Sequence, residues 1–229
     1  MNRLKKAFRI AMGKMINIRP EVNIQSEWMG NDYGGFFVSP ERMNDGGIVY
    51  SFGIGEDISF DRAMIEKYGC RVFAFDPTPK SIKWVEQSDL PSQFSFYPVG
   101  LGAQNGSATF YLPKNKEHVS GSMVTHNNLD ETSAIEVEMK SFTTIVDELG
   151  HDYIDVVKMD IEGAEYDVLE SLLNTPVKIR QLLIEFHDRF VDGGIGATKR
   201  AITTLSNHGF RVFAASNTHE EISFINTSF

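Results

Sequence analysis

The chain has 229 residues, of which 41% are hydrophobic and 23% charged, and its formal net charge is −9 at pH 7. This length and composition fit one domain with a substantial core. No apolar run approaches the ~20 residues of a membrane-spanning helix, the N-terminus lacks a secretory signal, and the one cysteine, Cys70, cannot form an internal disulfide. These features argue against an integral membrane protein and a disulfide-rich secreted domain, and we expect a soluble, cytoplasmic protein.

The first 20 residues differ in charge from the rest of the chain, because they hold six basic side chains and no acid. Leu4, Phe8 and Met12 follow one another at helical spacing in this segment. A basic amphipathic helix of this kind either binds an anionic membrane or a partner protein, or packs back onto its own domain. The acidic remainder has no basic stripe, so we expect no nucleic-acid partner and favour a small or neutral substrate.

From residue 48 onward, short β-branched and aromatic runs alternate with helical periodicity, which predicts an α/β domain over residues 48–229 with a mostly parallel sheet. Residues 1–47 then form an N-terminal extension, in which Trp28 and the turn at Tyr33 are expected to build a lid or substrate wall. The predicted strands span residues 48–53, 70–75, 94–99, 154–159, 180–186, 210–215 and 221–226. The predicted helices span residues 57–68, 79–87, 141–149 and 163–174.

Two features depart from a simple alternation of strand and helix. The last two strands are separated by only a few polar residues, which permits only a hairpin, so the sheet is expected to end in one antiparallel strand. Residues 107–112 and 134–140 are further strand-like runs, joined by a polar loop that contains His118 and His126. They predict an insertion that either reaches over the active face or forms a plain surface hairpin.

Gly53 and Gly55 stand at the carboxyl end of the first strand of the domain, where glycines let the backbone turn sharply and approach a ligand. Ile58 occupies the place of the third glycine of a dinucleotide motif, and Glu56 and Asp57 would repel a pyrophosphate. These two acids would instead attract the ammonium and sulfonium cations of S-adenosylmethionine, or would only cap the following helix.

Asp76 ends the second predicted strand, about 20 residues after the glycine turn. An acid at that place can accept both hydroxyl protons of an adenosine ribose, because a carboxylate has two acceptor oxygens and no donor. The alternative is a turn residue, since Asp-Pro is a common turn dipeptide. Together with the glycine turn, Asp76 favours a nucleoside-containing cofactor.

A third group of candidates follows the strand at 154–159. Asp160 and Glu162 come at its carboxyl end, before Gly163 opens a helix, and ligands of open α/β sheets bind at that edge. The neighbouring strand ends with Glu185 and His187, two residues apart and hence on one face. His187 is the candidate base, because the pKa of histidine suits proton transfer near neutral pH.

Other interpretations of this third group remain open. His187 at a strand end can also be a hydrogen-bonded structural residue, and Glu162 can be an acid at a helix N-terminus. The preferred assignment contains no metal, but Asp160, Glu185 and His187 offer oxygen and imidazole ligands that suit several divalent metals.

These motifs together resemble the FkbM-type methyltransferases, a branch of the S-adenosylmethionine-dependent enzymes with a Rossmann-like, seven-stranded class I fold. The resemblance is carried by FAFDPTPKS at 73–81, YPVGLGAQNGSATFY at 97–111, VVKMDIEGAEYDVL at 156–169 and LLIEFH at 182–187. It implies that Gly53, Gly55 and Asp76 hold the cofactor, that Gly100 and Leu101 border the adenine, and that Asp160 and Glu162 face the reacting centre.

The resemblance implies an S-adenosylmethionine-dependent O-methyltransferase that acts on a sugar, a glycan or a small natural product. In this hypothesis His187 accepts the proton of the acceptor hydroxyl and Asp160 orients that hydroxyl. Two alternatives remain: a nicotinamide-dependent oxidoreductase, which the missing third glycine and the closing hairpin disfavour, and a binding protein that has kept the fold without catalysis. The sequence does not identify the acceptor or the oligomeric state.

Overall fold

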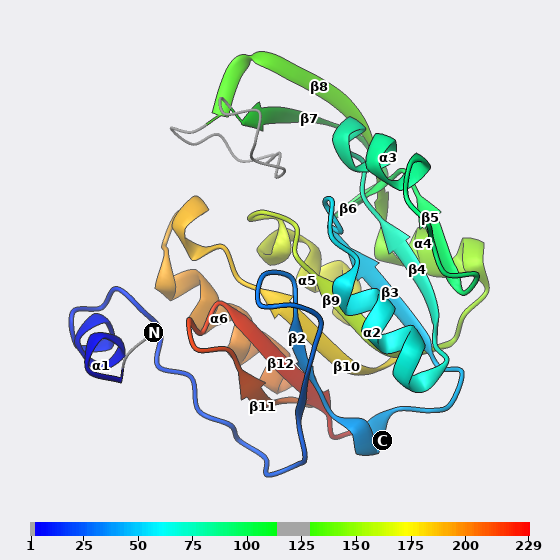
Figure 1. The fold of residues 1–229 in the computed structure, drawn as a ribbon. Helices are drawn as coiled ribbons and strands as arrows, with labels where there is room; N and C mark the ends of the chain where they lie inside the picture. Colours follow the sequence, from blue (N-terminus) through cyan, green and yellow to red (C-terminus); the bar gives the residue numbers. More distant parts are fainter. Residues whose placement is uncertain (1–2, 114–128) are drawn as a thin grey trace.

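A computed structural model describes the backbone of residues 3–113 and 129–229, and a seven-stranded sheet forms its centre (Figure 1). The strands lie in the order β11-β12-β10-β9-β3-β4-β5. Their bounds are β3 Ile48–Phe52, β4 Arg71–Phe75, β5 Phe94–Tyr97, β9 Tyr153–Met159, β10 Lys178–Glu185, β11 Phe210–Ala215 and β12 Glu221–Asn226.

All pairings in this sheet are parallel except those of β12, which runs antiparallel to both β10 and β11. The predicted α/β fold, with a mostly parallel sheet and a terminal antiparallel hairpin, is therefore confirmed. The largest difference at the carboxyl end of a predicted strand is in β5, which ends at Tyr97 and not at residue 99. Pro98 follows directly and has no N–H to donate to the ladder, which explains the early end.

Helices cover both faces of the sheet (Figure 1). On one face, α4, α5 and α6 pack on the larger hydrophobic cluster, which contains Phe142, Leu169 and Leu205. On the other, α2 and α3 pack on a second cluster that contains Phe60 and Val85. The helices are α2 Ser59–Tyr68, α3 Pro79–Glu86, α4 Phe142–Leu149, α5 Glu165–Leu173 and α6 Ile195–Asn207.

Four of these helices agree with the predicted ranges to within two residues at each end, whereas α6 had no predicted range. The two clearest differences are at helix starts. Helix α2 begins at Ser59 and not at residue 57, and α5 begins at Glu165 and not at residue 163. Glu162 and Gly163 have φ angles of +53° and +104°, which are not helical, so the chain must turn before α5 can start.

The predicted insertion forms a second, three-stranded sheet in the order β6-β8-β7. Its strands are β6 Gly100–Gly102, β7 Gly106–Pro113 and β8 Leu129–Ser141, and β7 and β8 pair antiparallel. They project above the carboxyl edge of the central sheet (Figure 1). The loop with His118 and His126 lies outside the described residues.

The N-terminal extension packs partly into the body. Its strands β1 Glu27–Met29 and β2 Phe36–Val38 form a small antiparallel pair, and Phe36 and Val38 are buried in the second cluster. The extension thus contributes to the core, while the predicted domain boundary at residue 48 stays a prediction.

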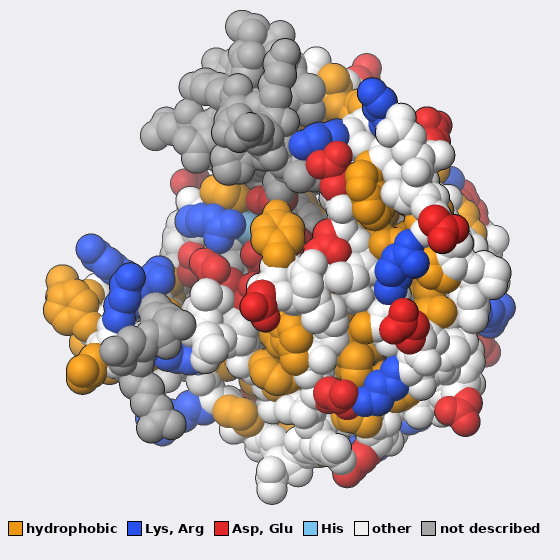
Figure 2. All heavy atoms as spheres, viewed as in Figure 1, with side chains coloured by type: hydrophobic (Ala, Val, Ile, Leu, Met, Phe, Trp, Pro, Cys, Tyr) orange, Lys and Arg blue, Asp and Glu red, His pale blue; other side chains and the backbone are white. Residues whose placement is uncertain are grey.

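Helix α1 (Arg3–Ala11) stands apart from the body, and Figure 2 displays its basic and hydrophobic side chains on the left. Leu4, Phe8 and Met12 are all more than half exposed. The predicted contact of this segment with an anionic membrane or a partner protein stays a prediction. In the described part of the chain, no helix is long and apolar enough to cross a membrane.

Candidate functional site

The glycine turn after β3 brings the chain against the end of β9. Gly53 and Gly55 have φ angles of +75° and +55°, a region that favours glycine. A Cβ atom on Gly53 would lie 1.6 Å from the Asp160 carbonyl oxygen. No other residue type fits there without moving the backbone, so the turn and the end of β9 lie in direct contact.

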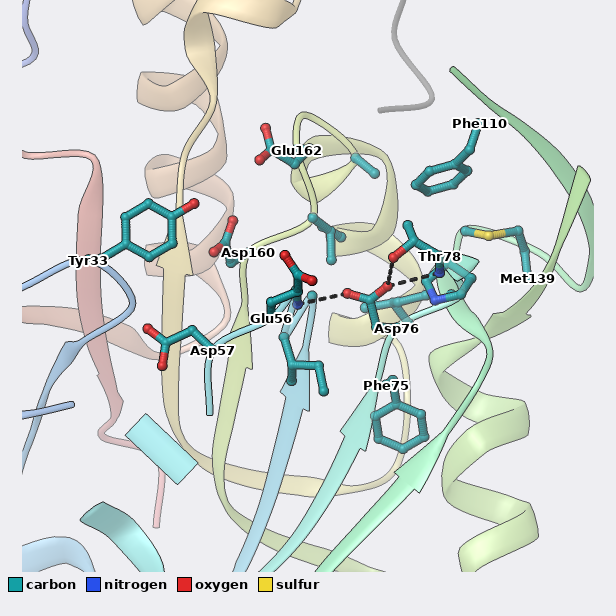
Figure 3. Close-up of a pocket in the computed structure, with 18 of the residues that line it drawn as sticks. Tyr33, Glu56, Asp57, Phe75, Asp76, Thr78, Phe110, Met139, Asp160 and Glu162 are labelled. Atoms are coloured by element: carbon teal, nitrogen blue, oxygen red, sulfur yellow. Dashed lines mark hydrogen bonds between the residues drawn. The ribbon is translucent and has the colours of Figure 1, made fainter. Parts of the chain in front are cut away.

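Asp76 follows β4 and faces this turn (Figure 3). One carboxylate oxygen accepts a hydrogen bond of 2.9 Å from the Gly55 N–H, and the other accepts from the N–H and the hydroxyl of Thr78, at 2.9 and 2.6 Å. The side chain is therefore fixed in orientation, and the oxygen bonded to the Gly55 N–H keeps a lone pair for a ligand hydroxyl. This geometry suits the predicted contact with a ribose.

A cavity of about 660 Å³ lies over the carboxyl ends of β3, β4 and β9, within the size range of small-molecule sites. Phe110 and Met139 of the insertion and Tyr33 of the N-terminal extension line it, as Figure 3 shows. Each cofactor-binding residue predicted from the sequence lines it as well: Gly53, Gly55, Glu56, Asp57, Asp76, Gly100, Leu101 and Asp160.

Glu56 and Asp57 line the cavity, but both carboxylates also have protein partners. Glu56 forms a 3.0 Å ion pair with Lys80, and Asp57 accepts hydrogen bonds from the Asn31 side chain and from the Ser59 N–H at the start of α2. Asp57 thus supports the helix start while it lines the cavity, and its predicted attraction for the cations of S-adenosylmethionine stays a prediction.

Lys158 supports the glycine turn from below. It is only 4% exposed, and its ammonium group donates a 3.3 Å hydrogen bond to the Gly53 carbonyl oxygen. Asp61 of α2 is buried nearby; burial raises its pKa to about 6, although the positive charge of Lys158 acts in the opposite direction. This buried cation beside the turn was not identified from the sequence, where Lys158 only interrupts an apolar strand.

The loop after β9 is held by Glu165, the first residue of α5, which is fully buried. Its carboxylate accepts hydrogen bonds from the Ile161 and Gly163 N–H groups, at distances of 3.0–3.2 Å. The loop carries Asp160 and Glu162, both of which line the cavity. Glu165 therefore positions the two predicted acids by binding the backbone on both sides of Glu162.

Glu165 also contacts His187, which follows β10. The Nδ1 atom of His187 lies 2.8 Å from a Glu165 oxygen. Its Nε2 atom lies 3.4 Å from Glu185, 3.5 Å from Glu162 and 3.7 Å from Asp160. Four carboxylates thus surround one imidazole, and the structure brings together all the residues predicted at this edge.

The surroundings of His187 do not fit its predicted role as the base. The side chain is 1% exposed and does not line the cavity. Burial alone would lower its pKa, but the hydrogen bond to Glu165 and the negative charges of the neighbouring carboxylates outweigh it and raise the pKa to about 10. An imidazole that is already protonated at neutral pH cannot accept a proton from a substrate.

The carboxylates respond to the same environment. Burial raises the pKa of both Asp160 and Glu185. The rise is larger for Glu185, because the positive charges of Lys158 and His187 oppose the shift at Asp160, whereas at Glu185 His187 opposes it. Both shifts reflect the cost of placing several negative charges in a poorly hydrated site. Strongly shifted acids that adjoin a cavity are typical of functional sites.

Besides Lys158, sequence reasoning missed three residues that shape this site. Thr78 fixes Asp76, Asn31 binds Asp57, and Glu165 holds the loop after β9. A signal existed for Glu165, because an acid directly after Gly-Ala at a helix start can bind the preceding N–H groups. Asn31 gave no comparable signal, since it lies far from Asp57 in the chain.

The chain is similar in sequence to a known protein family and to individual relatives. The model of the family described as "Methyltransferase FkbM domain" matches residues 41–212. Human "Probable methyltransferase-like protein 24" is 28% identical over 141 residues, which cover 61% of this chain and 32% of that protein. The "2-O-methyltransferase NoeI" of Sinorhizobium fredii is 24% identical over 156 residues, which cover 62% of this chain and 64% of that protein. The chain therefore matches less than two thirds of the length of either relative.

Among solved structures, Aeropyrum pernix fibrillarin with natively bound S-adenosyl-L-methionine matches with a TM-score of 0.47 at 12% sequence identity. The match covers 82% of this chain and 68% of that one.

A closing antiparallel hairpin on a seven-stranded sheet, with a glycine turn and a strand-end acid over one cavity, is the arrangement of the class I methyltransferase fold. The family match then decides the group within that class. This chain belongs to the FkbM methyltransferase domain family, and its cofactor is S-adenosylmethionine. The same family match argues against the alternative of a nicotinamide-dependent oxidoreductase.

We expect Asp76→Ala to weaken S-adenosylmethionine binding about 10- to 100-fold, since a hydrogen bond to a charged group contributes ~1.5–3 kcal/mol. Thr78→Val is the matched control, because it removes one partner of Asp76 and leaves the carboxylate in place. Calorimetric titration of both variants measures the effect. Equal affinities of the wild type and Asp76→Ala would rule out Asp76 as a cofactor ligand.

Proposed function

We propose that the protein transfers the methyl group of S-adenosylmethionine to a hydroxyl oxygen on a sugar, a glycan or a small natural product. The supporting observation is that two carboxylates, Asp160 and Glu162, line the same cavity as the glycine turn and Asp76. An alcohol acceptor needs a proton acceptor beside the cofactor, and these carboxylates lie at the sheet edge where ligands of α/β proteins bind.

The reaction itself sets the demands on the site. Bound S-adenosylmethionine, which Gly53, Gly55 and Asp76 would hold, would supply the methyl group: a C–O bond to the acceptor would form as the C–S bond broke, which would leave the sulfur neutral. The hydroxyl proton must pass to a base, and the two reactants must be held in line, which accounts for much of the rate. A site that performs this step has to fix the hydroxyl and remove one proton.

Glu162 is the proposed base. It lines the cavity, and its φ angle of +53° is rare for a residue other than glycine. Such strained conformations concentrate at functional sites, where the surrounding structure holds them. Here the Glu165 hydrogen bonds to Ile161 and Gly163 hold the backbone on both sides of Glu162. Asp160 then orients the acceptor hydroxyl, and His187 lies behind both carboxylates as a positioning residue.

Two further observations favour a hydroxyl acceptor of sugar type. The relative NoeI is named a 2-O-methyltransferase. Tyr33 is 74% exposed where it lines the cavity, and a tyrosine ring offers an apolar face with a polar tip to a ring-shaped substrate.

The test uses S-adenosylmethionine with a deuterated methyl group and a panel of sugars, glycans and phenolic or aliphatic natural products, with the mass of each acceptor as the readout. We expect an oxygen-bound label on at least one acceptor and a loss of turnover of about 100-fold or more in Glu162→Gln, with cofactor affinity unchanged. Label found only on nitrogen or carbon would contradict O-methylation. Unchanged turnover in Glu162→Gln would contradict the role of Glu162, and cofactor binding without any transfer would favour the non-catalytic alternative.

A further inference from the structure

The Nε2 atom of His187 faces three carboxylates at the carboxyl edge of β9 and β10 without a hydrogen bond of normal length. The ring is 1% exposed, and its other nitrogen, Nδ1, is bonded to Glu165. The three carboxylate oxygens that face Nε2 lie 3.4–3.7 Å away, whereas N–H···O hydrogen bonds span ~2.7–3.2 Å. A proton on Nε2 therefore lies too far from each of them to make a normal hydrogen bond.

The distances between Nε2 and these carboxylate oxygens instead suit a metal cation, which is larger than a proton. Atoms bound to one metal ion at ~2.0–2.2 Å lie ~3 Å apart when they are adjacent and ~4 Å apart when they are opposite. The ligand atoms of Asp160, Glu185 and His187 all lie within 4.8 Å of one another. Movements of a few tenths of an ångström would bring these three atoms around one ion.

The contact that His187 makes with its second ring nitrogen also matches that of a metal-binding histidine. A histidine that binds a metal through one ring nitrogen usually donates its other N–H to a carboxylate, which fixes the tautomer and the ring orientation. Glu165 makes that contact with Nδ1, and Glu165 is itself held by the Ile161 and Gly163 N–H groups. Nε2 is thereby left to bind a cation.

The charge balance gives an independent reason. Asp160, Glu162, Glu165 and Glu185 place four carboxylates around one imidazole, and the side chain of each is at most 25% exposed. The imidazolium of His187 and the ammonium of Lys158, which acts on Asp160, are fewer than the four carboxylates, and buried charges without partners are costly. Because His187 would lose its proton to the solvent, a divalent cation would neutralise two of these charges, one more than the imidazolium does.

We propose that Asp160, Glu185 and His187 form a binding site for one divalent metal ion of the Mn²⁺ type, with Glu165 as the positioning residue of His187. Carboxylate oxygens and one imidazole are a ligand set that suits such ions. When the metal binds, His187 Nε2 gives up its proton to solvent and donates its lone pair to the ion. The role of the metal rests on the proposed function: of its three ligands Asp160 lines the cavity, and the ion would hold this carboxylate where it orients the acceptor hydroxyl.

Mn²⁺ binding can be measured without any turnover, by the loss of the electron paramagnetic resonance signal of free Mn²⁺ on addition of chelator-treated protein. We expect one Mn²⁺ per chain, and binding at least about 10-fold weaker in Glu185→Gln and in His187→Gln. Asp167→Asn is the matched control, because this acid lies near Glu165 on α5 but is exposed, and we expect it to bind like the wild type. Circular dichroism verifies that each variant is folded.

Absence of Mn²⁺ binding by the wild type would overturn the proposal, and so would equal binding by the wild type and both cluster variants. Calorimetric titration of the same samples with S-adenosylmethionine separates the two accounts. Cofactor binding without Mn²⁺ binding would refute the metal site alone, whereas failure to bind the cofactor would count against the proposed function.

Discussion

Replacement of Gly53 by alanine is expected to lower the free energy of unfolding by about 2–5 kcal/mol and to abolish cofactor binding. The new methyl group would lie 1.6 Å from the Asp160 carbonyl oxygen, so the glycine turn and the loop after β9 must separate. Overpacking costs ~1–3 kcal/mol, and the left-handed backbone of Gly53 costs an L-residue ~1–2 kcal/mol more. Urea denaturation and calorimetric titration with S-adenosylmethionine measure the two effects.

Gly150→Ala is the matched control for this change. Gly150 caps α4 with a φ angle of +69°, close to the +75° of Gly53, but a Cβ atom there would meet nothing within 4 Å. We expect the control to lose only the conformational part, about 1–2 kcal/mol, and to bind the cofactor normally. Equal free energies of unfolding in the two variants would show that the contact between the turn and the end of β9 does not contribute to stability.

Replacement of Glu165 by alanine is expected to cost about 3 kcal/mol or more of stability. Its fully buried carboxylate is the acceptor for the Ile161 N–H, the Gly163 N–H and the His187 ring, and a buried donor that loses its partner costs ~1–3 kcal/mol. Because the loop carries Asp160 and Glu162, we also expect turnover to fall more than cofactor affinity. Denaturation and steady-state kinetics provide the measurements.

Glu165→Gln separates the shape of this side chain from its charge. The amide keeps one carbonyl oxygen for the backbone N–H groups but presents an NH₂ group in place of the second acceptor. We therefore expect a smaller loss of stability than in Glu165→Ala. A change of less than about 0.5 kcal/mol in the alanine variant, within the usual range for surface positions, would contradict the role of Glu165.

The fold was predictable because its signals are local. The strands from Ile48 to Asn226 are short β-branched and aromatic runs, and the brief link between the last two allows only a hairpin. The glycine turn and Asp76 follow strand ends, and the carboxyl ends of parallel strands meet at one edge of a sheet. Residues far apart in the chain were therefore expected to share a site, and the cavity contains them.

The part that could not be predicted depends on what surrounds each side chain. His187 is an attractive base in the sequence, but its neighbours Glu165, Glu185 and Asp160 hold a proton on it and bury it behind the cavity. The hydrophobic periodicity of the sequence does not indicate which charged groups surround a buried side chain. Asn31 likewise reaches Asp57 only because the N-terminal extension folds back over the start of α2.

The most direct test of the site is calorimetric titration of S-adenosylmethionine and S-adenosylhomocysteine into the wild type, Gly53→Ala and Asp76→Ala. The account predicts micromolar binding of one cofactor per chain, no detectable binding in folded Gly53→Ala, and weaker binding in Asp76→Ala. Wild-type affinity in both variants would mean that the cofactor binds elsewhere, and would contradict the assignment of this cavity as the site of methyl transfer.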